Sequence, residues 1–266
     1  MKIIDCFTFY NELDLLNYRL NVLNNVVDYF VIVEATHTHV GNPKKLYFKD
    51  NAAQFEQFKH KIIHVVVDDF PFKQPNVDVS KGQQWANEHF QRNCIERGIK
   101  QLELNDDDYI IVCDLDEIPD PETLTKIKTS AKNFTILRLE MDLYYYNLNL
   151  QINKWYLAKI LTFSAFKQFN SCENIRQHAS QFLQKGGWHL SYFGDEQFVK
   201  NKIQNFAHQE FNNDNHATIE HIKNNIETGT DLFGRESWFK LNKISIKDNA
   251  YLPPDYEKYL SKYYTY

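Results

Sequence analysis

Acidic residues follow directly on an apolar, β-branched segment in the middle of the chain. Residues 109–113 are predicted to form a buried strand, and Asp114-Leu115-Asp116 comes straight after it. Burying an unpaired carboxylate is costly, so a strand that ends in Asp-x-Asp is expected to deliver charge to a ligand. In an extended backbone, residues two apart project to the same side, which would let Asp114 and Asp116 reach one cation together. Oxygen ligands suit Mn²⁺ or Mg²⁺, and the simplest use of such a site is to hold a nucleotide diphosphate.

Strand-like segments alternate with amphipathic helices around this motif. Strands are predicted at residues 2–7, 29–34, 61–67 and 109–113, and helices at 12–24, 51–58 and 83–102. Asp120, followed by Pro121 and Glu122, has the form of an N-cap that begins another helix. This order predicts an α/β fold with a mostly parallel central sheet flanked by helices, and with ligands at the carboxyl ends of the strands.

The second half of the chain has a different pattern. It predicts a strand at 134–139, a strand or hairpin at 155–166, a turn at 186–189 and a short helix at 198–206. The Tyr-rich segment 140–149 could stack on sugar faces or belong to the core. After Tyr251 the chain is expected to wrap the surface. No internal repeat and no linker is evident, so residues 1–266 are predicted to form a single domain.

Composition excludes several classes of protein. With 43% hydrophobic residues and a net charge of −5, the chain has enough apolar matter for a core and no excess of basic residues for non-specific nucleic-acid binding. Its four cysteines form no CxxC pair, which excludes a zinc ribbon, and Cys6 and Cys113 are expected to be reduced core thiols. No stretch reaches the roughly 18 apolar residues of a membrane span. We expect a soluble protein in the cytoplasm of a microbial or viral-host setting, or in the Golgi lumen if an anchor has been removed.

Four blocks of the sequence, in order, resemble glycosyltransferase family 17. They are residues 5–16, 31–35 with 41–44, 114–119, and 187–194 with 202–203 and 206–210. The resemblance implies a GT-A-like, Rossmann-type fold in which residues 1–130 bind a nucleotide sugar and residues 131–266 bind the acceptor and wrap the surface. It implies a metal-dependent, inverting transfer of a sugar, with N-acetylglucosamine favoured, from a UDP-sugar to a hydroxyl of a glycan or glycoprotein.

The resemblance also implies roles for particular residues in binding the donor. Asp114 and Asp116 would ligate Mn²⁺ or Mg²⁺ or the donor ribose, and His208 would be a third metal ligand, although a lone histidine is more often simply hydrogen-bonded in place. Further donor contacts are expected at the ends of the first, second and fourth strands and on the long helix: Phe7, Thr8, Phe9, Glu34, Arg92 and Leu115. The alternatives are a strand-end acid for Glu34 and a surface charge for Arg92.

An inverting transfer needs a general base across the sugar from the metal. Asp195 is the predicted base, with Glu210 as its competitor, and Trp188 and His189 are predicted to contact the sugar or the acceptor. An ordinary turn acid is the alternative for Asp195. Gly186-Gly187 in the same block would let backbone approach the donor closely.

Two rival functions share the acidic motif or the fold. One is a phosphatase of the haloacid-dehalogenase type, in which the first Asp of Asp-x-Asp is a nucleophile. That class places the motif after its first strand, whereas here it follows the fourth predicted strand. The other is a non-catalytic carbohydrate-binding protein. Release of UDP from UDP-GlcNAc in the presence of Mn²⁺ would distinguish a transferase from both.

Overall fold

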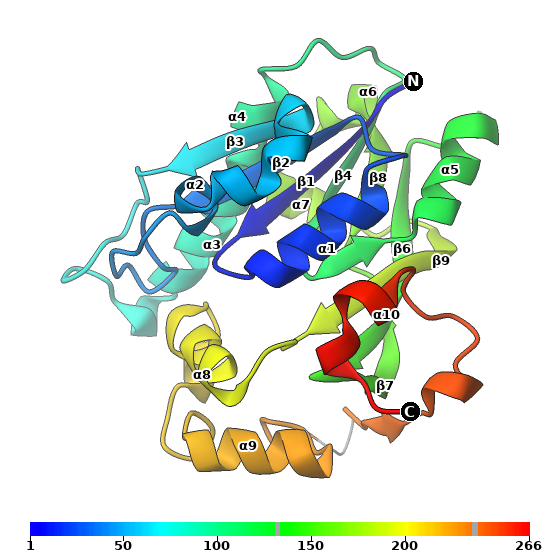
Figure 1. Ribbon diagram of the computed structural model, residues 1–266. Coiled ribbons are helices and arrows are strands. Elements are labelled where there is room, and N and C mark those ends of the chain that lie inside the picture. The colour runs from blue at the N-terminus through cyan, green and yellow to red at the C-terminus, as the bar shows by residue number, and fades with distance from the viewer. Residues whose placement is uncertain (131–133, 236–238) are drawn as a thin grey trace.

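A ten-stranded mixed sheet organises the chain in the computed structural model, which describes residues 1–130, 134–235 and 239–266 (Figure 1). Its strands are β1 Ile3–Phe9, β2 Tyr29–Ala35, β3 Ile62–Val67, β4 Tyr109–Asp114, β5 Glu117–Pro119, β6 Ile136–Tyr145, β7 Asn147–Trp155, β8 Lys159–Thr162, β9 Phe182–Ser191 and β10 Asn242–Lys243. The main strand order is β10-β7-β6-β8-β4-β1-β2-β3, and β9 joins β5 to β6.

Helices flank this sheet. They are α1 Leu13–Leu23, α2 Tyr47–Asp50, α3 Gln83–Asn93, α4 Ile95–Ile99, α5 Pro121–Ser130, α6 Phe163–Phe166, α7 Cys172–Gln177, α8 Glu196–Asn205, α9 Ile219–Thr228 and α10 Tyr256–Tyr259. Short 3-10 helices include Ala52–Lys61 and Gln209–Phe211. The α/β class predicted from the sequence is confirmed.

The first four long strands form the parallel half of the sheet. β1 lies between β2 and β4 and runs parallel to both, while β3 is parallel to β2. Their side chains alternate between two cores, as the period of two along a strand requires. Ile111 and Cys113 of β4 face the core under α1, and Ile110 and Val112 face the core under α4 and α7. The parallel order brings the carboxyl ends of β1, β2 and β4 to one edge of the sheet.

The second half of the sheet is mainly antiparallel, so the central sheet as a whole is mixed, with its main parallel part in the first half of the chain. β8 pairs antiparallel with β4 and β6, and β7 with β6, whereas β9 runs parallel to β6. Tyr144, Tyr145 and Tyr146, at the end of β6 and just after it, are buried. The tyrosines of the 140–149 segment that could have stacked on sugars therefore belong largely to the core.

Three local predictions are wrong in detail. The turn expected at 186–189 is the middle of β9, where Gly187 has φ +138° and a Cβ would lie 2.0 Å from the Ile118 carbonyl oxygen. The two glycines thus let neighbouring strands meet closely. The helix expected at 83–102 ends at Asn93 and restarts as α4 after Cys94. The segment 155–166 supplies the end of β7, then β8, then α6.

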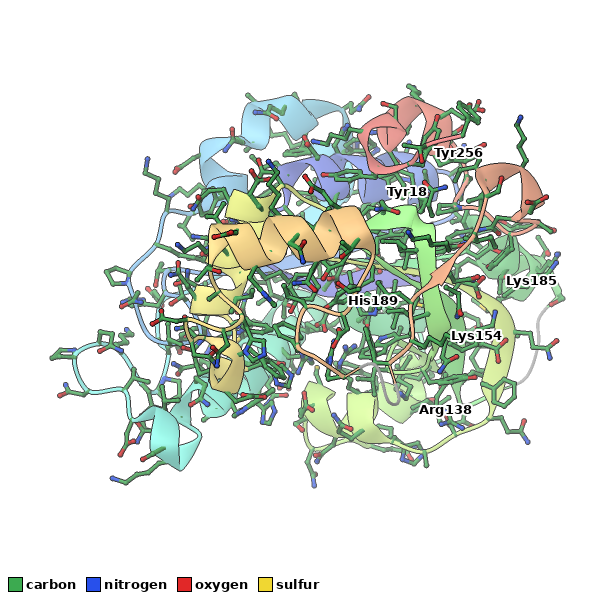
Figure 2. The ribbon with its side chains drawn as sticks, turned by 90° about the horizontal axis from the view of Figure 1, so that it is seen from below. Tyr18, Arg138, Lys154, Lys185, His189 and Tyr256 are labelled. Carbon is green, nitrogen blue, oxygen red and sulfur yellow. The ribbon has the colours of Figure 1, made fainter. Side chains whose placement is uncertain are left out.

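The C-terminal segment covers α1 and the edge of β9. Tyr259 contacts Tyr18 of α1 with ring centroids 5.9 Å apart, and the Trp188 indole donates a hydrogen bond to the Tyr251 carbonyl at 3.0 Å. Figure 2 shows Tyr256 on the same side of the molecule as Tyr18. The chain after Tyr251 thus packs on Tyr18 and Trp188, and Trp188 is buried.

Two smaller expectations concern cysteines and membrane spans. All four cysteines are free and buried, in agreement with reduced core thiols. Among the described residues, no helix combines the length and the apolar character that crossing a bilayer would need.

Candidate functional site

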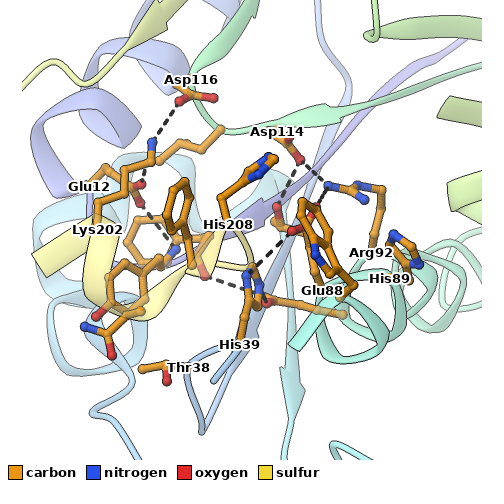
Figure 3. A pocket seen from close by; sticks show the side chains of 18 of the residues that line it. Glu12, Thr38, His39, Glu88, His89, Arg92, Asp114, Asp116, Lys202 and His208 are labelled. Atoms are coloured by element: carbon orange, nitrogen blue, oxygen red, sulfur yellow. Dashed lines mark hydrogen bonds and ion pairs between the residues drawn. The ribbon is translucent and has the colours of Figure 1, made fainter. Parts of the chain in front are cut away.

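A cavity of about 450 Å³ opens at the carboxyl ends of β1, β2 and β4, between α3 on one side and α8 on the other (Figure 3). It mixes aromatic side chains with charges of both signs. The residues that line it are Thr8, Phe9, Tyr10, Glu12, His37, Thr38, His39, Lys44, Trp85, Glu88, His89, Gln91, Arg92, Asp114, Leu115, Asp116, Trp155, Leu157, Glu173, Arg176, Gln177, His189, Ser191, Tyr192, Lys202, Asn205, Phe206 and His208.

Asp114, at the end of β4, is held by two guanidinium groups. Arg92 of α3 donates to its Oδ1 at 3.2 Å, and Arg176 of α7 donates to its Oδ2 at 2.7 Å. The Thr8 hydroxyl, on the neighbouring strand, donates to Oδ1 at 3.3 Å. Burial alone would raise the pKa of Asp114, but Arg176 and Arg92 outweigh it and bring the pKa down to about 2. This carboxylate is therefore ionised and neutralised from two sides.

Both arginines are fixed in turn by other acids. Arg176 makes a bidentate pair with Glu117, with both N–O distances 2.7 Å, and Glu117 is completely buried. A bidentate pair of this kind fixes the guanidinium plane as well as its position. Arg92 is paired with Glu88 and Glu173, and its side chain is only 4% exposed. These two cations are rigid parts of the cavity wall.

Asp116 has a different set of partners. Lys202 of α8 donates to its Oδ2 at 3.0 Å, and His189 Nε2 of β9 lies 3.5 Å from its Oδ1. Burial opposes ionisation, but Lys202 and then His189 hold the pKa of Asp116 well below its usual range. The carboxylate of Asp116 is thus charged at any physiological pH and faces the cavity.

Arg19 of α1 fixes the backbone that carries both acids. Its side chain is fully buried and pairs with Asp5 through Nε at 2.8 Å and Nη2 at 2.6 Å. Its Nη1 donates to the carbonyl oxygens of Asp114, Leu115 and Glu117 at 3.1, 2.8 and 2.7 Å. One guanidinium therefore ties the acidic loop to β1 and α1.

The structure brings many of the predicted site residues together. Those that line the cavity are Thr8, Phe9, Arg92, Asp114, Leu115, Asp116, His189 and His208. Others lie outside its lining: Phe7, Glu34, Trp188, Asp195 and Glu210. Phe7 is buried beneath the Arg19 guanidinium, 4.4 Å from ring centroid to Cζ, and Trp188 is buried in the core beside Tyr251. Neither ring is placed to stack on a ligand in this cavity.

Glu34 is a buried structural acid at the end of β2. Its Oε1 accepts the backbone N–H of Phe48 at 3.0 Å, and its Oε2 lies 3.0 Å from His64 Nε2. Its link to the cavity is indirect, through Lys44, which lines the cavity and whose Nζ is 3.8 Å from Glu34. The geometry favours a role in holding α2 and Lys44 over contact with the nucleoside.

The two candidates for the base serve local structure. Asp195 is the N-cap of α8, and its Oδ1 accepts the Phe198 N–H at 2.8 Å. Glu210 accepts from His208 Nδ1 at 2.6 Å, and its side chain is 54% exposed. The cap supports the alternative of a structural turn acid at Asp195.

The donor atoms present can be compared with what a hard cation requires. Asp114 and Asp116 offer ionised oxygen ligands on one cavity wall, which is the chemistry that Mg²⁺ and Mn²⁺ take when substrate phosphates and water complete the shell. Within residues 1–130, 134–235 and 239–266, no group of three or more His, Cys, Asp or Glu side chains is assembled to hold a metal. The residues fit a shared protein–substrate site, and His208 is not grouped with the two acids as a third ligand.

Several residues of the site had no clear signal in the sequence. Glu117 follows the acidic motif directly, and nothing in the neighbouring sequence indicates that its side chain is buried. Arg176 and Lys202 lie 62 and 86 residues from the acids they contact. Lys202 does fall within the fourth family-like block, which was the one hint available.

A parallel α/β sheet edge that carries acids and fixed cations around a cavity is typical of proteins that bind phosphorylated ligands. Comparison with known sequences gives the family. The pattern of glycosyltransferase family 17 matches residues 1–238, and the chain belongs to this family. This is the family that the resemblance predicted.

Curated relatives match a shorter part of the chain. The chain is 33% identical over 124 residues to the beta-1,4-mannosyl-glycoprotein 4-beta-N-acetylglucosaminyltransferase of Rattus norvegicus, and 33% to that of Homo sapiens. The corresponding protein of Mus musculus is 32% identical over the same length. The aligned segment is 44% of this chain, and it spans only 22% of the length of each relative.

Proposed function

We propose that this protein is a GT-A-type glycosyltransferase that moves a sugar, N-acetylglucosamine first among the candidates, from a UDP-sugar to a hydroxyl of a glycan or glycoprotein. The observation that carries the proposal is the cavity edge itself, where the ionised pair Asp114 and Asp116 stands among Arg92, Arg176 and Lys202. A nucleoside diphosphate is negatively charged. The two acids could bind it through a shared divalent cation, and the neighbouring arginines and lysine could pair with its phosphate oxygens directly. The names of the relatives supply the donor sugar and the class of acceptor.

In this proposal Asp116, with Asp114 beside it, would hold a divalent cation, Mn²⁺ or Mg²⁺, which would supply positive charge to stabilise the leaving diphosphate. Arg92 and Arg176 cannot turn away from the cavity wall, because Glu88, Glu173 and Glu117 hold them. Cations fixed in advance stabilise developing negative charge without a cost of reorganisation. Arg92 and Arg176 are therefore the protein's own contribution to stabilising the negative charge of the leaving diphosphate.

The phosphatase alternative is disfavoured by the contacts of Asp114. A nucleophilic carboxylate needs a free oxygen directed at the phosphorus, yet both oxygens of Asp114 accept hydrogen bonds from guanidinium groups. A non-catalytic carbohydrate-binding protein of the same fold would not need acids and cations at a diphosphate site. Incubation with UDP-GlcNAc and Mn²⁺ distinguishes the classes: we expect release of UDP, which increases when a glycan acceptor is added. If no UDP is released from several UDP-sugars, with or without glycan acceptors, the proposal is wrong.

UDP-sugars are expected to protect the fold more than GDP-sugars. A ligand at a concentration of 100 times its Kd stabilises the native state by about 2.7 kcal/mol, which gives a readily measured rise in Tm. We expect UDP-GlcNAc with Mn²⁺ to produce the larger shift and GDP-mannose a small one, in thermal unfolding at matched concentrations. A larger shift with GDP-mannose would reject uridine as the base while leaving the transferase class intact.

Replacing Asp195 with asparagine tests whether this residue is the base. Asparagine caps helices about as well as aspartate, so stability is expected to change little. Because the Asp195 carboxylate lies outside the cavity lining, we expect near-normal turnover, measured as UDP release with acceptor present. A fall in kcat of about a hundredfold or more, the typical scale for loss of a general base, would instead assign Asp195 that role.

A further inference from the structure

Lys202 differs from the other two cations that face the acidic pair. Its Nζ donates to Asp116 Oδ2 at 3.0 Å and lies 3.8 Å from Glu12 Oε1, as the dashed lines in Figure 3 show. Its side chain is 20% exposed and lines the cavity. Whereas each arginine is fixed by at least one further acid at short distance, Lys202 has a single short contact with an acid among the described residues. Lysine also has a flexible four-carbon stem and a compact charge.

The backbone beneath Lys202 is held in place, whereas its side chain extends into the cavity, where Nζ also lies 5.4 Å from the Tyr192 ring centroid. The Tyr10 hydroxyl, at the end of β1, donates to Asn201 Oδ1 at 2.8 Å and so fixes α8 one residue away. Val199 and Ile203 of the same helix are completely buried in a core with β6 and β7. Because this helix is fixed, the Lys202 ammonium can change its partner only if the lysine side chain rotates. The four-carbon stem sets how far the ammonium can move.

The ammonium group and a divalent cation compete for one carboxylate. Lys202 lies at hydrogen-bond distance from Asp116, and two positive charges cannot occupy that position together without strong repulsion. Asp114 cannot replace Asp116 as the main ligand, because Arg92 and Arg176 already donate a hydrogen bond to each of its oxygens. Binding of a cation at Asp116 thus requires the ammonium to leave, and an ammonium in a partly buried cavity needs another anion. The diphosphate of the donor would bring that anion.

We propose that Lys202 is the counter-ion of Asp116 in the donor-free enzyme, that it gives up this carboxylate to the divalent cation, and that it then pairs with the diphosphate of the nucleotide sugar. The inference rests on the proposed function and adds a residue and a binding sequence to it. It predicts that the cation and the nucleotide bind with positive coupling. The cation displaces the Lys202 ammonium from Asp116, and the diphosphate then pairs with the displaced ammonium; such coupling is reciprocal.

Removing the charge of Lys202 should change the two affinities in opposite directions. In Lys202→Met, Mn²⁺ without nucleotide no longer has to displace an ammonium, so its affinity is expected to rise about tenfold, within the usual range of coupling between sites. UDP with saturating Mn²⁺ loses a cation partner, so its affinity is expected to fall about tenfold. Titration calorimetry with UDP, and the electron paramagnetic resonance signal of free Mn²⁺, measure both constants without any need for turnover.

Matched variants keep the test decisive. Lys200→Met removes a charge from the same helix two residues earlier, outside the cavity lining, and both affinities should stay at the wild-type values. Lys202→Gln keeps a hydrogen-bond donor for Asp116 without the charge, so it replaces Lys202→Met if that variant does not fold, and it should show the same opposite changes.

The outcomes separate this inference from the proposed function. Wild-type protein that binds UDP with Mn²⁺, together with Lys202 variants whose two affinities are unchanged or fall together, would overturn the role of Lys202 alone. Wild-type protein that fails to bind UDP, with or without Mn²⁺, would overturn the proposed function and this inference with it. Opposite shifts in both Lys202 variants, with none in Lys200→Met, would establish the counter-ion role.

Discussion

Replacing Asp116 with asparagine is expected to remove Mn²⁺-dependent binding of UDP and to lower kcat by about a hundredfold or more, the scale seen when one fixed electrostatic contact to a transition state is lost. Asparagine has the size of aspartate and leaves Lys202 a hydrogen-bond acceptor, but it is a poor ligand for a hard cation. The residue faces the cavity rather than the core, and Glu12 still lies 3.8 Å from the Lys202 ammonium, so the protein should remain folded.

A matched control for this variant is Asp106→Asn. Asp106 lies in the turn before β4, its side chain is 73% exposed, and its partner is Lys167 on the surface. UDP affinity, its dependence on Mn²⁺ and kcat should all be unchanged in this control. Full turnover in Asp116→Asn, or equal UDP affinity with and without Mn²⁺ in the wild type, would contradict the assignment of Asp116 as the metal ligand.

Replacing Arg19 with methionine is expected to have the largest effect on stability. The substitution leaves the buried Asp5 carboxylate with only the weak Cys113 thiol donor at 3.7 Å, and it also frees three carbonyl oxygens of the acidic loop. Breaking a buried ion pair from one side costs about 3–5 kcal/mol, a large part of the 5–15 kcal/mol by which typical domains are stable. Urea denaturation should show this loss, and the remaining folded protein should bind UDP poorly because its acidic loop has lost its anchor.

Two further variants show whether the buried ion pair causes the loss of stability in Arg19→Met. Arg97→Met removes an arginine whose pair with Asp69 is exposed, and such a pair contributes less than about 1 kcal/mol. The double variant Asp5→Asn with Arg19→Met removes both charges and should be more stable than Arg19→Met alone. If Arg19→Met were as stable as Arg97→Met, the buried pair would not hold the loop.

The parallel half of the fold could be predicted because its signals are local. Strands β1, β2, β3 and β4 are short apolar runs between turn residues, and the structure has each of them within two residues of the predicted bounds. The N-cap at Asp120 was equally readable, since its Oδ1 accepts the Glu122 N–H at 2.8 Å. The position of Asp114 and Asp116 at a strand end, and therefore at the ligand edge of a parallel sheet, followed from the same pattern.

Signals that depend on a distant neighbour cannot be interpreted from the local sequence. Gly186 and Gly187 have the composition of a turn, yet they lie in β9. Glycine is needed there because a Cβ at Gly187 would meet the backbone of β5 and one at Gly186 the backbone of β6. For these glycines the local sequence is compatible with a turn or a strand, and contact with β5 and β6 decides between the two. Asp195 caps α8 through the Phe198 N–H three residues away, and its assignment as the base stays a prediction.

The sequence by itself determined the family, the parallel strands and the acidic pair, because periodicity, caps and motifs act over a few neighbouring residues. Only the tertiary structure decided which charges complete the site. The chain has 30 lysines and arginines, and no local pattern marks Arg176 and Lys202 as the partners of acids 62 and 86 residues away. Their roles arise because α7 packs against β4 and α8 brings Lys202 to the loop after this strand, where desolvation makes an unpaired carboxylate costly and a nearby cation stabilising.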